Sequence, residues 1–338
     1  MNYLAFWAKK KAMPSMLIDD IYQQCIERII TAKRILLVTH ISPDGDALGS
    51  LCFMMAWLDM LQKPYSAYTA GPLPSTLSFL PGYDLICLDK KDLPVSECDL
   101  IISLDCGNVA RTGLVSEISG RRSDQFFIEI DHHPSVEKVS DLEIRDSSAA
   151  STTEILQAIA HRAGLRLNPV MSQCLLTGIS TDTANFRFSA TSNKTIAAAS
   201  RMLLGGASLS KIVDHTWRTK SLPDLKLWGT ALSRLERLER YNIAYTVITP
   251  EDFAATASDE EAMEGLAEFI SSLPDVAAIL VLRDDGRGFV RGNWRTIRDD
   301  IDVGALARFL GGGGHRKAAG FALPGRLTRR EDGWQVEN

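Results

Sequence analysis

Residues 40–46 read His-Ile-Ser-Pro-Asp-Gly-Asp, and they decide how the rest of the chain is interpreted. They follow the apolar run Ile-Leu-Leu-Val at 35–38, which is typical of a buried strand. They precede a stretch at 46–62 whose apolar residues recur at helical spacing. The segment therefore predicts a strand, a tight turn and a helix. Three side chains able to bind a metal, one histidine and two aspartates, lie in that turn.

The same combination of residues recurs twice downstream. Asp105 follows the apolar run 100–104, and the triplet Asp-His-His at 131–133 follows the run 126–130. Ligands in open α/β sheets gather beyond the carboxyl ends of the strands, so we expect these side chains to converge. Asp182, which we expect just after a helix, offers a further carboxylate.

A shared site for these side chains requires cations. Several carboxylates repel one another strongly in a protein interior unless positive charge compensates them. Each fragment by itself is common, since Asp-Gly-Asp also forms ordinary turns. Together they predict a site for two divalent ions. A mixed set of carboxylates and imidazoles favours Mn²⁺, with Mg²⁺, Co²⁺ and Zn²⁺ as alternatives.

Length and composition limit the class of protein. A chain of 338 residues suggests two domains. Its hydrophobic share of 45% and charged share of 23% are typical of a soluble globular protein. The net charge of −5 argues against a broad electrostatic grip on long double-stranded nucleic acid. A small anionic substrate held by a local basic patch remains compatible with this charge.

The cysteines and the N-terminus favour a cytoplasmic protein. The six cysteines include no pair at CxxC spacing, so reduced thiols are the simplest interpretation. The first eleven residues place a short apolar segment before three lysines, which is the wrong order for an export signal. No stretch approaches the roughly 20 apolar residues that a membrane span needs. We therefore predict no membrane partner.

The order of elements predicts an α/β fold in which a mostly parallel sheet with crossover helices is linked to a smaller α+β domain. Short apolar runs at 84–88, 100–104 and 126–130 alternate with helical patterns in the first half. Strands are expected again at 243–249, 276–283 and 289–295. The predicted boundaries are an N-terminal extension at 1–16, a metal domain at 17–205, a helical linker at 206–240, a second domain at 241–326 and a polar, frayed tail at 327–338.

Four motifs together resemble the DHH phosphoesterase superfamily. They are His-xxx-Asp-Gly-Asp-Ala-Leu-Gly-Ser at 40–50, Asp-Cys-Gly at 105–107, Asp-His-His at 131–133 and Thr-Asp-Thr at 181–183. The segment Gly-Gly-Gly-Gly-His-Arg-Lys-Ala-Ala-Gly at 311–320 resembles the signature of the DHHA1 domain. The chain most resembles the nanoRNase and pAp phosphatase branch, which also includes enzymes that cleave pApA and cyclic di-AMP.

The resemblance implies a role for each site residue. It implies that Asp105 bridges two ions, that His133 faces the substrate phosphate and stabilises the transition state, and that Asp131 orients a histidine. His40 and Asp44 would bind the first ion. The second ion would be bound by Asp46, His132 and Asp182.

Substrate contacts are expected from two further regions. Four successive glycines allow a backbone to approach an anion closely, so Gly312, Gly313 and Gly314 with His315 and Arg316 predict an anion-binding loop; a flexible hinge is the alternative. The resemblance places Arg295 at a phosphate-gripping position, although a shift to Arg291 is compatible with the local sequence. Asn108 and Arg111 could either contact phosphate or cap the next helix.

The resemblance implies a Mn²⁺-dependent phosphoesterase that hydrolyses short nucleotidic substrates through a bridging hydroxide activated by two metals. Oligoribonucleotides, pApA, cyclic di-AMP and pAp are the candidate substrates. An inorganic pyrophosphatase or exopolyphosphatase is one alternative. A nucleotide-binding regulator without turnover is another. The sequence leaves open the preferred substrate, the cleavage polarity, the physiological metal and whether the chain forms a homodimer.

Overall fold

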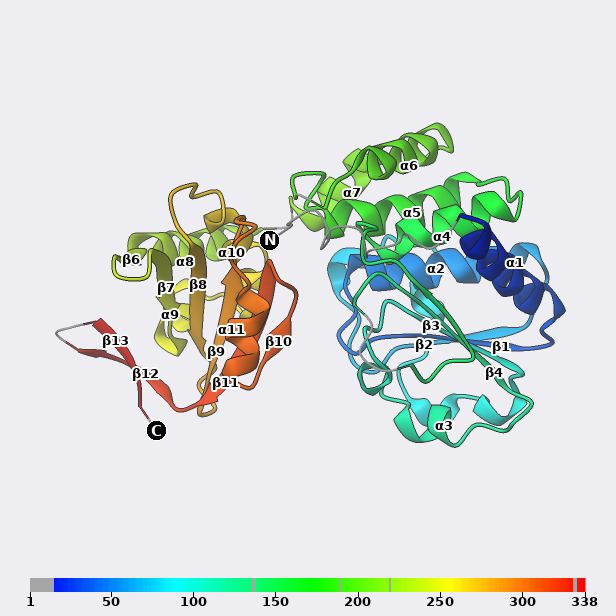
Figure 1. Cartoon of the computed structure of the whole chain (residues 1–338). Coiled ribbons are helices and arrows are strands. Elements are labelled where there is room, and N and C mark those ends of the chain that lie inside the picture. Colours follow the sequence, from blue (N-terminus) through cyan, green and yellow to red (C-terminus); the bar gives the residue numbers. More distant parts are fainter. Residues whose placement is uncertain (1–14, 135–137, 189, 219, 331–332, 338) are drawn as a thin grey trace, which may run out of the picture. The chain divides into compact units, whose positions relative to one another are not determined.

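The computed structural model describes residues 15–134, 138–188, 190–218, 220–330 and 333–337. The chain divides into two compact units, Met1–Arg218 and Thr219–Asn338 (Figure 1). Nearly all of the predicted N-terminal extension at 1–16 lies outside the described residues; the first described element, helix α1, begins at Ser15.

The first unit contains a five-stranded sheet in the order β2-β1-β3-β4-β5, and every strand pair in it is parallel. Its strands are β1 (Ile35–Thr39), β2 (Tyr65–Tyr68), β3 (Leu100–Leu104), β4 (Phe126–Asp131) and β5 (Leu142–Arg145). Its helices are α1 (Ser15–Thr31), α2 (Gly45–Met60), α3 (Val115–Ser119), α4 (Thr152–Arg162), α5 (Pro169–Asp182), α6 (Asn193–Leu204) and α7 (Leu209–Thr216). Short 3₁₀ turns are η3 (Ser75–Leu77), η4 (Tyr83–Leu85), η5 (Lys90–Asp92), η6 (Val95–Glu97) and η7 (Val109–Thr112).

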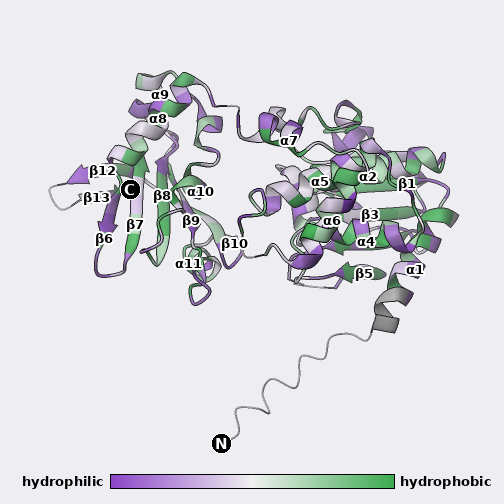
Figure 2. Cartoon of the chain, turned by 90° about the horizontal axis from the view of Figure 1, so that it is seen from above, coloured by the Kyte–Doolittle hydropathy of each residue, from purple (hydrophilic) through white to green (hydrophobic). Residues whose placement is uncertain are grey.

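Layers on both faces bury this sheet. Helices α2, α4 and α5 lie over one face, and α3 lies on the other (Figure 1). All residues of β1 and β3 are buried, which explains why these strands read as continuous apolar runs. The hydrophobic colouring in Figure 2 accordingly follows the strands and the inner helices of this unit. The predicted α/β fold with a parallel sheet is confirmed.

The second unit is a smaller α+β domain. Its mixed sheet has the order β10-β11-β9-β8-β7-β6, in which β7 and β8 are parallel and the other neighbours are antiparallel. The strands are β6 (Glu236–Leu238), β7 (Ile243–Ile248), β8 (Ala278–Asp284), β9 (Phe289–Arg295), β10 (Gly313–Gly314), β11 (Ala318–Pro324), β12 (Arg326–Arg330) and β13 (Gly333–Glu337). The helices are α8 (Leu222–Ser233), α9 (Pro250–Thr256), η8 (Glu260–Met263), α10 (Leu266–Ile270) and α11 (Val303–Phe309).

The predicted linker at 206–240 is not a separate segment in the structure. Helix α7 belongs to the first unit, whereas α8 and β6 belong to the second. Leu227 and Ala231 of α8 are buried in the core of the second unit, and β6 pairs with β7. The sequence did not reveal this division, because apolar positions at helical spacing indicate a helix without indicating the core that it joins.

The tail at 327–338 is not frayed over its described residues. Strands β12 and β13 form an antiparallel hairpin, and the Leu327 backbone N–H donates to Asp284 Oδ2 across 3.1 Å. The Trp334 ring lies 5.8 Å from the guanidinium carbons of both Arg234 and Arg329. Backbone pairing and cation–π contacts hold this hairpin, and both are compatible with the polar composition on which the prediction rested.

One predicted strand is absent from the structure, and the observed strand β2 was not predicted. The apolar run at 84–88 contains the 3₁₀ turn η4 and one isolated bridge, Tyr68 to Cys87, instead of a strand. The sequence did not indicate β2, one of the two edge strands of the sheet, because only two of its four residues are buried.

No single helix among the described residues is long and apolar enough to cross a membrane. Helices α6 and α7 together reach the length and apolar composition of a span, but the chain bends by 104° at the break between them.

Candidate metal centre

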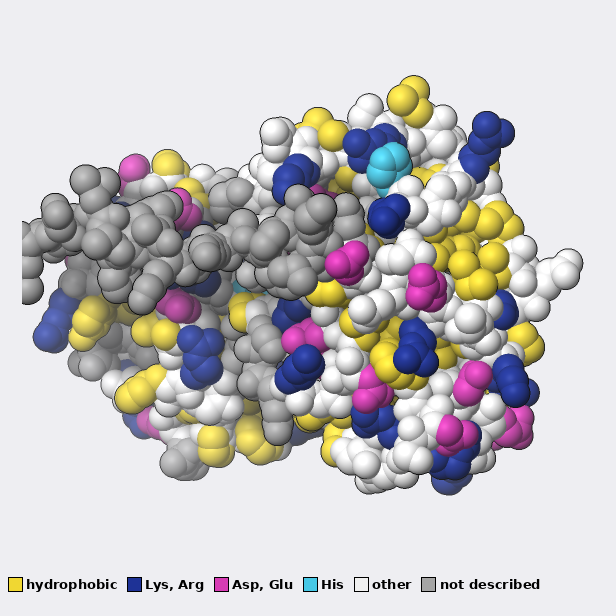
Figure 3. Space-filling view, turned by 45° about the vertical axis from the view of Figure 1, so that its right-hand side comes forward, with side chains coloured by type: hydrophobic (Ala, Val, Ile, Leu, Met, Phe, Trp, Pro, Cys, Tyr) yellow, Lys and Arg dark blue, Asp and Glu magenta, His cyan; other side chains and the backbone are white. Residues whose placement is uncertain are grey.

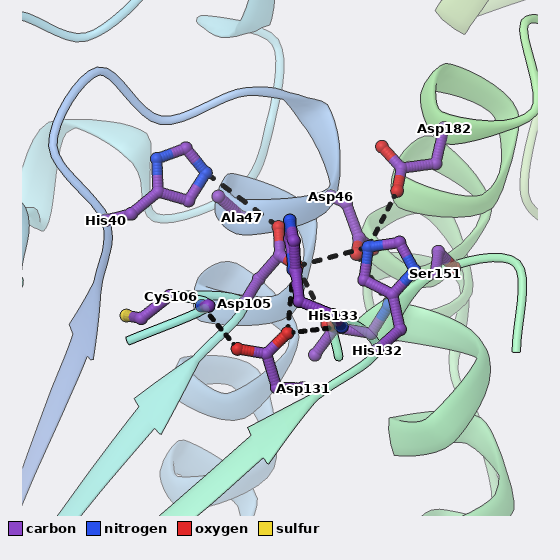
Figure 4. A network of polar contacts seen from close by, with 12 residues as sticks. His40, Asp46, Ala47, Asp105, Cys106, Asp131, His132, His133, Ser151 and Asp182 are labelled. Atoms are coloured by element: carbon purple, nitrogen blue, oxygen red, sulfur yellow. Dashed lines mark hydrogen bonds and ion pairs between the residues drawn. The ribbon is translucent and has the colours of Figure 1, made fainter. Parts of the chain in front are cut away.

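The ends of three neighbouring strands bring the predicted site residues together. His40 follows β1, Asp105 follows β3, and Asp131 is the last residue of β4. Because β1, β3 and β4 are adjacent in the sheet, these residues meet at one edge. Figure 4 shows their side chains pointing toward one another, with Asp182 approaching from the end of α5.

His40 is held in an orientation suited to a ligand. Its Nδ1 donates to the Ile41 carbonyl oxygen across 2.9 Å, which fixes the tautomer and leaves Nε2 facing two carboxylates. Nε2 lies 3.9 Å from Asp44 Oδ2 and 3.8 Å from Asp105 Oδ2. Burial lowers the pKa of His40, so the neutral imidazole that metal binding requires is favoured.

Asp44 has two roles at the start of α2. Its Oδ1 accepts hydrogen bonds from the backbone N–H groups of Asp46 and Ala47, each across 3.1 Å, and so caps the helix. Its Oδ2 faces His40. Between the two aspartates, a Cβ on Gly45 would lie 2.3 Å from Thr181 Oγ1, so a glycine lets α2 approach α5. The Asp-Gly-Asp turn therefore combines a cap, a close approach and two carboxylates.

The first turn of α4 fixes the carboxylate of Asp46. The Thr152 backbone N–H donates to Oδ2 across 2.6 Å, and the backbone N–H and hydroxyl of Thr153 donate to Oδ1 across 3.0 and 2.7 Å. A carboxylate placed at a helix N-terminus also gains from the helix dipole. Asp46 is fully buried, so these three donors hold it in one orientation.

Asp105 lies at the centre of the cluster. Its oxygens lie 3.8 Å from His40 Nε2, 3.5 Å from His132 Nε2 and 3.4 Å from His133 Nδ1. Oδ1 also accepts a hydrogen bond from the Thr152 hydroxyl across 2.9 Å. Its φ of 61° lies in the left-handed region, a strained conformation for a non-glycine residue that is common at functional sites.

Burial and mutual repulsion disfavour the charged forms of these carboxylates. Burial, reinforced by the charge of Asp105, raises the pKa of Asp46 to about 7. Burial also raises the pKa of Asp105 to about 7, although His133 opposes the shift. The pKa of Asp182 is raised for the same reasons, burial first and then Asp46. Positive charge from divalent cations would remove this penalty, and the donor set of oxygens and imidazole nitrogens suits them.

Asp131 differs from its neighbours because it is already paired. Burial acts to raise its pKa, but hydrogen bonds and charge from His133 outweigh burial and lower the pKa to about 2. The His133 Nδ1 and backbone N–H both lie 2.8 Å from Asp131 Oδ1, and the Gly107 N–H lies 2.5 Å from Oδ2. Burial would lower the pKa of His133, yet Asp105 and Asp131 raise it to about 10.

Among the residues that the structure describes, three groups of donor atoms lie close enough to hold a metal ion, with all atoms of each group within 4.8 Å of one another. Asp105 belongs to two of these groups, and His132 also belongs to two, one with Asp105 and one with Asp46 and Asp182. The groups are His40 with Asp44 and Asp105; Asp46 with His132 and Asp182; and Asp105 with His132 and His133. The first two are the sets that the resemblance implied for two ions.

Of the predicted substrate residues in the first unit, Asn108 caps η7. Its Oδ1 accepts a hydrogen bond from the Arg111 backbone N–H across 3.2 Å. The Arg111 guanidinium lies near the cluster: a Cβ on Gly107 would lie 3.3 Å from Arg111 Nη1 and 3.7 Å from the His133 ring. The structure therefore gives Asn108 a capping role and places Arg111 beside the residue expected to face phosphate.

The predicted substrate residues of the second unit lie on β9, on β10 and on the residues directly before and after β10. Arg295 Nη1 donates to the Trp294 carbonyl oxygen across 3.0 Å, and burial lowers the pKa of its guanidinium. Arg316 Nη2 donates to the Asp299 carbonyl oxygen across 2.7 Å, and the side chain of His315 is exposed.

The glycines of the loop are not equivalent. A Cβ on Gly312 would lie 2.1 Å from the Gly320 carbonyl oxygen, and one on Gly314 would lie 2.6 Å from that of Ala318. A Cβ on Gly313 would meet nothing within 4 Å. Close approach to β11 therefore accounts for Gly312 and Gly314 without a ligand. Gly311 and Gly313 have no such packing constraint, and of these two only Gly311 has a positive φ, of 76°.

Sequence reasoning missed several residues that support the centre. Thr152 and Thr153 follow Ser151, whose position before an apolar periodic segment is a helix-cap signal that could have been noticed. Arg145, on β5, contacts Asp131 and gave no sequence signal. Gly178 lies where a Cβ would be 2.4 Å from Asp46 Oδ1, and only the packing of α2 on α5 reveals that constraint.

Comparisons with known proteins agree with this geometry. The DHH family, N-terminal domain, matches residues 34–179, and the DHHA1 domain matches residues 241–332. The bifunctional oligoribonuclease and PAP phosphatase NrnA of Thermus thermophilus is 30% identical over 292 residues, which cover 86% of this chain and 84% of that protein. The Bacillus subtilis protein of the same name is 29% identical over 307 residues, covering 89% and 92%.

A solved structure shows the same fold over both units. The crystal structure of an exopolyphosphatase-related protein from Bacteroides fragilis has a TM-score of 0.83 and 26% sequence identity, and the match covers 89% of this chain and 90% of that one. The chain therefore belongs to the metal-dependent phosphoric ester hydrolases of the DHH and DHHA1 family, in the branch of the NrnA-type nanoRNases and PAP phosphatases.

Proposed function

We propose that this protein is a Mn²⁺-dependent hydrolase of short nucleotidic substrates, namely oligoribonucleotides, pApA or cyclic di-AMP, and pAp. The observation that carries the proposal is the pair of donor groups that meet near Asp105. The names of the relatives from Thermus thermophilus and Bacillus subtilis, which specify oligoribonuclease and PAP phosphatase activity, support the choice of substrates.

We assign one cation to His40, Asp44 and Asp105. The other is assigned to Asp46, His132 and Asp182, with Asp105 bridging both. Bound cations would supply Lewis acidity, which polarises the phosphoryl group and makes water nucleophilic at neutral pH. The carboxylates contribute by holding that charge in a fixed place. Because the donors from α4 orient Asp46 before any ligand binds, little reorganisation is needed.

His133 and its neighbours act on the substrate phosphate in this proposal. Asp131 fixes His133 through Nδ1, so we assign the other ring nitrogen, Nε2, to a non-bridging phosphate oxygen. An imidazolium there stabilises the negative charge that the transition state develops. The Arg111 guanidinium, adjacent to His133, is assigned to the same phosphate.

The second unit is assigned to the rest of the nucleotide. Arg295 offers a planar fork of donors suited to a distal phosphate, and Gly313, His315 and Arg316 offer further donors on one loop. Short substrates fit the charge of the protein. On the described part of the face drawn in Figure 3, Lys and Arg side chains are interspersed with Asp and Glu instead of forming a continuous basic track.

A substrate panel tests this proposal. Purified protein is incubated with Mn²⁺ and, in turn, a short oligoribonucleotide, pApA, cyclic di-AMP and pAp, and kcat/KM is measured for each. We expect turnover of at least one of them. Asp105→Asn should lower kcat/KM for that substrate by more than the ~10–100-fold loss that is typical when a residue contacting a metal ligand is replaced. A variant with unchanged Mn²⁺-dependent activity would refute the assignment of Asp105.

An exopolyphosphatase-like activity is the second candidate, because the solved neighbour from Bacteroides fragilis carries that description. Pyrophosphate and a short polyphosphate are therefore included in the panel. Phosphate release from these, without mononucleotide release from pApA, would favour the alternative. Binding of pAp without product in Mn²⁺ would instead indicate a nucleotide-binding regulator. The cytoplasmic location and the homodimer stay predictions.

A further inference from the structure

Four charged residues lie together on one face of β4 and β5, beside the metal centre. The strand register pairs Glu129 with Glu143 and Asp131 with Arg145. Positions two apart on a strand share a face, so the four side chains form a square of three carboxylates and one guanidinium. The side chains of Glu129, Asp131 and Arg145 are at most 8% exposed.

Arg145 contacts each of the three carboxylates. Its Nε donates to Glu143 Oε1 across 2.7 Å, its Nη2 lies 3.7 Å from Glu129 Oε1, and its Nη1 lies 3.4 Å from Asp131 Oδ2. Like charges directly opposite in a sheet, such as Glu129 and Glu143, repel one another. The positive guanidinium compensates the repulsion between the two glutamates. The carboxylates in turn hold the guanidinium, so it has little freedom to move.

The same guanidinium also binds the backbone that carries the histidines. Nη1 donates to the His133 carbonyl oxygen across 3.0 Å and lies 3.5 Å from the Gly107 carbonyl oxygen. Gly107 N–H in turn donates to Asp131. One nitrogen of Arg145 thus reaches the Asp131 carboxylate and both loops that flank it. Asp131 then holds His133 through Nδ1.

We propose that Arg145 is a positioning residue that sets the orientation of Asp131 and, through it, of the His133 ring. The proposal rests on the proposed function for its kinetic consequence, since His133 is the side chain assigned to the phosphate. The described contacts of Arg145 include none of the six residues that are assigned as metal ligands. Losing it should therefore affect turnover more than substrate affinity.

Two readouts test the proposal. In metal-free protein labelled with ¹⁵N-histidine, the ring signals of His133 report the hydrogen bond from Nδ1 to Asp131. In Mn²⁺, kcat and KM are measured separately. The variants are Arg145→Met, Arg145→Lys and Glu143→Gln; the last keeps the guanidinium but weakens its anchor. The matched control is Arg121→Met, which removes another largely buried arginine of the same unit that contacts a carboxylate, Asp141, away from the centre.

We expect Arg145→Met to displace the His133 ring signals and to lower kcat by about 10- to 100-fold with KM changed less than about twofold. Arg145→Lys should restore part of kcat, because it keeps the charge but not the fork, and Glu143→Gln should give a smaller loss of the same kind. Arg121→Met should change neither readout. Thermal unfolding confirms that each variant is folded at the assay temperature.

A purely structural role would lower the unfolding temperature but leave the ring signals and the kcat of the folded fraction unchanged, and that result would overturn the proposal. If Arg145→Met does not fold, Arg145→Lys and Glu143→Gln carry the decision, and unaltered His133 signals in both would count against it. If the wild-type protein hydrolyses no substrate, the proposed function fails. The ring signals then still decide whether Arg145 orients His133.

Discussion

The backbone N–H of Thr152 lies 2.6 Å from Asp46 Oδ2, across 106 positions of sequence, and the hydroxyl of the same residue donates to Asp105 Oδ1. One residue at the start of α4 therefore holds a carboxylate from each assigned metal site. Thr153 adds a hydroxyl to Asp46. The centre is oriented by a helix N-terminus that supplies no ligand itself.

Replacing the Thr152 hydroxyl should weaken metal binding. Thr152→Val keeps the shape and the backbone N–H but removes the donor to Asp105, so we expect Mn²⁺ affinity to fall by about 10- to 100-fold, as for other residues that orient metal ligands. Calorimetric titration with Mn²⁺ measures this. Thr177→Val is the control, because that buried hydroxyl donates to the Gln173 carbonyl oxygen within its own helix and touches no residue of the metal centre among the described contacts. Equal affinities in the two variants would contradict the orienting role.

A methyl group at Gly178 should disturb Asp46 directly. The added Cβ would lie 2.4 Å from both Asp46 Oδ1 and Thr153 Oγ1, so Gly178→Ala forces α2, α4 and α5 apart. We expect a loss of about 1–3 kcal/mol in the free energy of unfolding, as for other overpacked cores. Metal affinity should fall as well.

Gly229→Ala should change the free energy of unfolding in the opposite direction, and it serves as the control for Gly178→Ala. Gly229 lies in the middle of α8 and an added Cβ meets nothing within 4 Å. The change should stabilise the protein by about 0.5–1 kcal/mol, because alanine loses less conformational freedom in a helix. Urea unfolding measures both variants, and a Gly178→Ala protein as stable as wild type would show that the helices can separate at no cost.

Two glycines of the loop at 311–314 should respond differently to alanine. Gly312→Ala would clash with β11, so we expect a lower unfolding temperature. Gly313→Ala meets open space, so the unfolding temperature should stay within about 2 °C of wild type, since a change of 1 kcal/mol already shifts it by roughly that much or more. If the loop binds phosphate, Gly313→Ala should raise KM. An unchanged KM for a folded Gly313→Ala protein would support the hinge alternative.

The pair of Arg234 with Asp252 should make the second unit sensitive to acid. Burial acts to raise the pKa of Asp252, but Arg234 and the Thr249 N–H more than offset it, so the pKa is lowered. A carboxyl with a depressed folded pKa stabilises the fold above its unfolded pKa, about 3.9, and loses that contribution as pH falls through the folded value.

Asp252→Asn should therefore be less stable than wild type near neutral pH, and the difference should shrink as pH falls below about 4. Urea unfolding at several pH values measures it. Asp300→Asn is the control, because Asp300 pairs with Arg298 at an exposed position where solvent screens the charges. A stability difference for Asp252→Asn that does not change with pH would show that the pair does not carry the effect.

The sequence by itself determined which chemistry lies at the strand ends. Apolar runs ending at His40, Asp105 and Asp131 predicted a parallel sheet, and the carboxyl ends of its strands had to share one edge. Helix patterns and the glycine loop likewise predicted the second domain. These features follow from local periodicity and from residue types at element ends, both of which can be read along a single chain.

Only the tertiary structure decided how those side chains are held. The register of β4 against β5 places Arg145 opposite Asp131, and the packing of α4 on α2 places Thr152 against Asp46. The tail hairpin depends in the same way on the long-range contact between Leu327 and Asp284. Such pairs join residues up to 106 positions apart, and no local pattern encodes them, because register and packing result from the burial of the whole core.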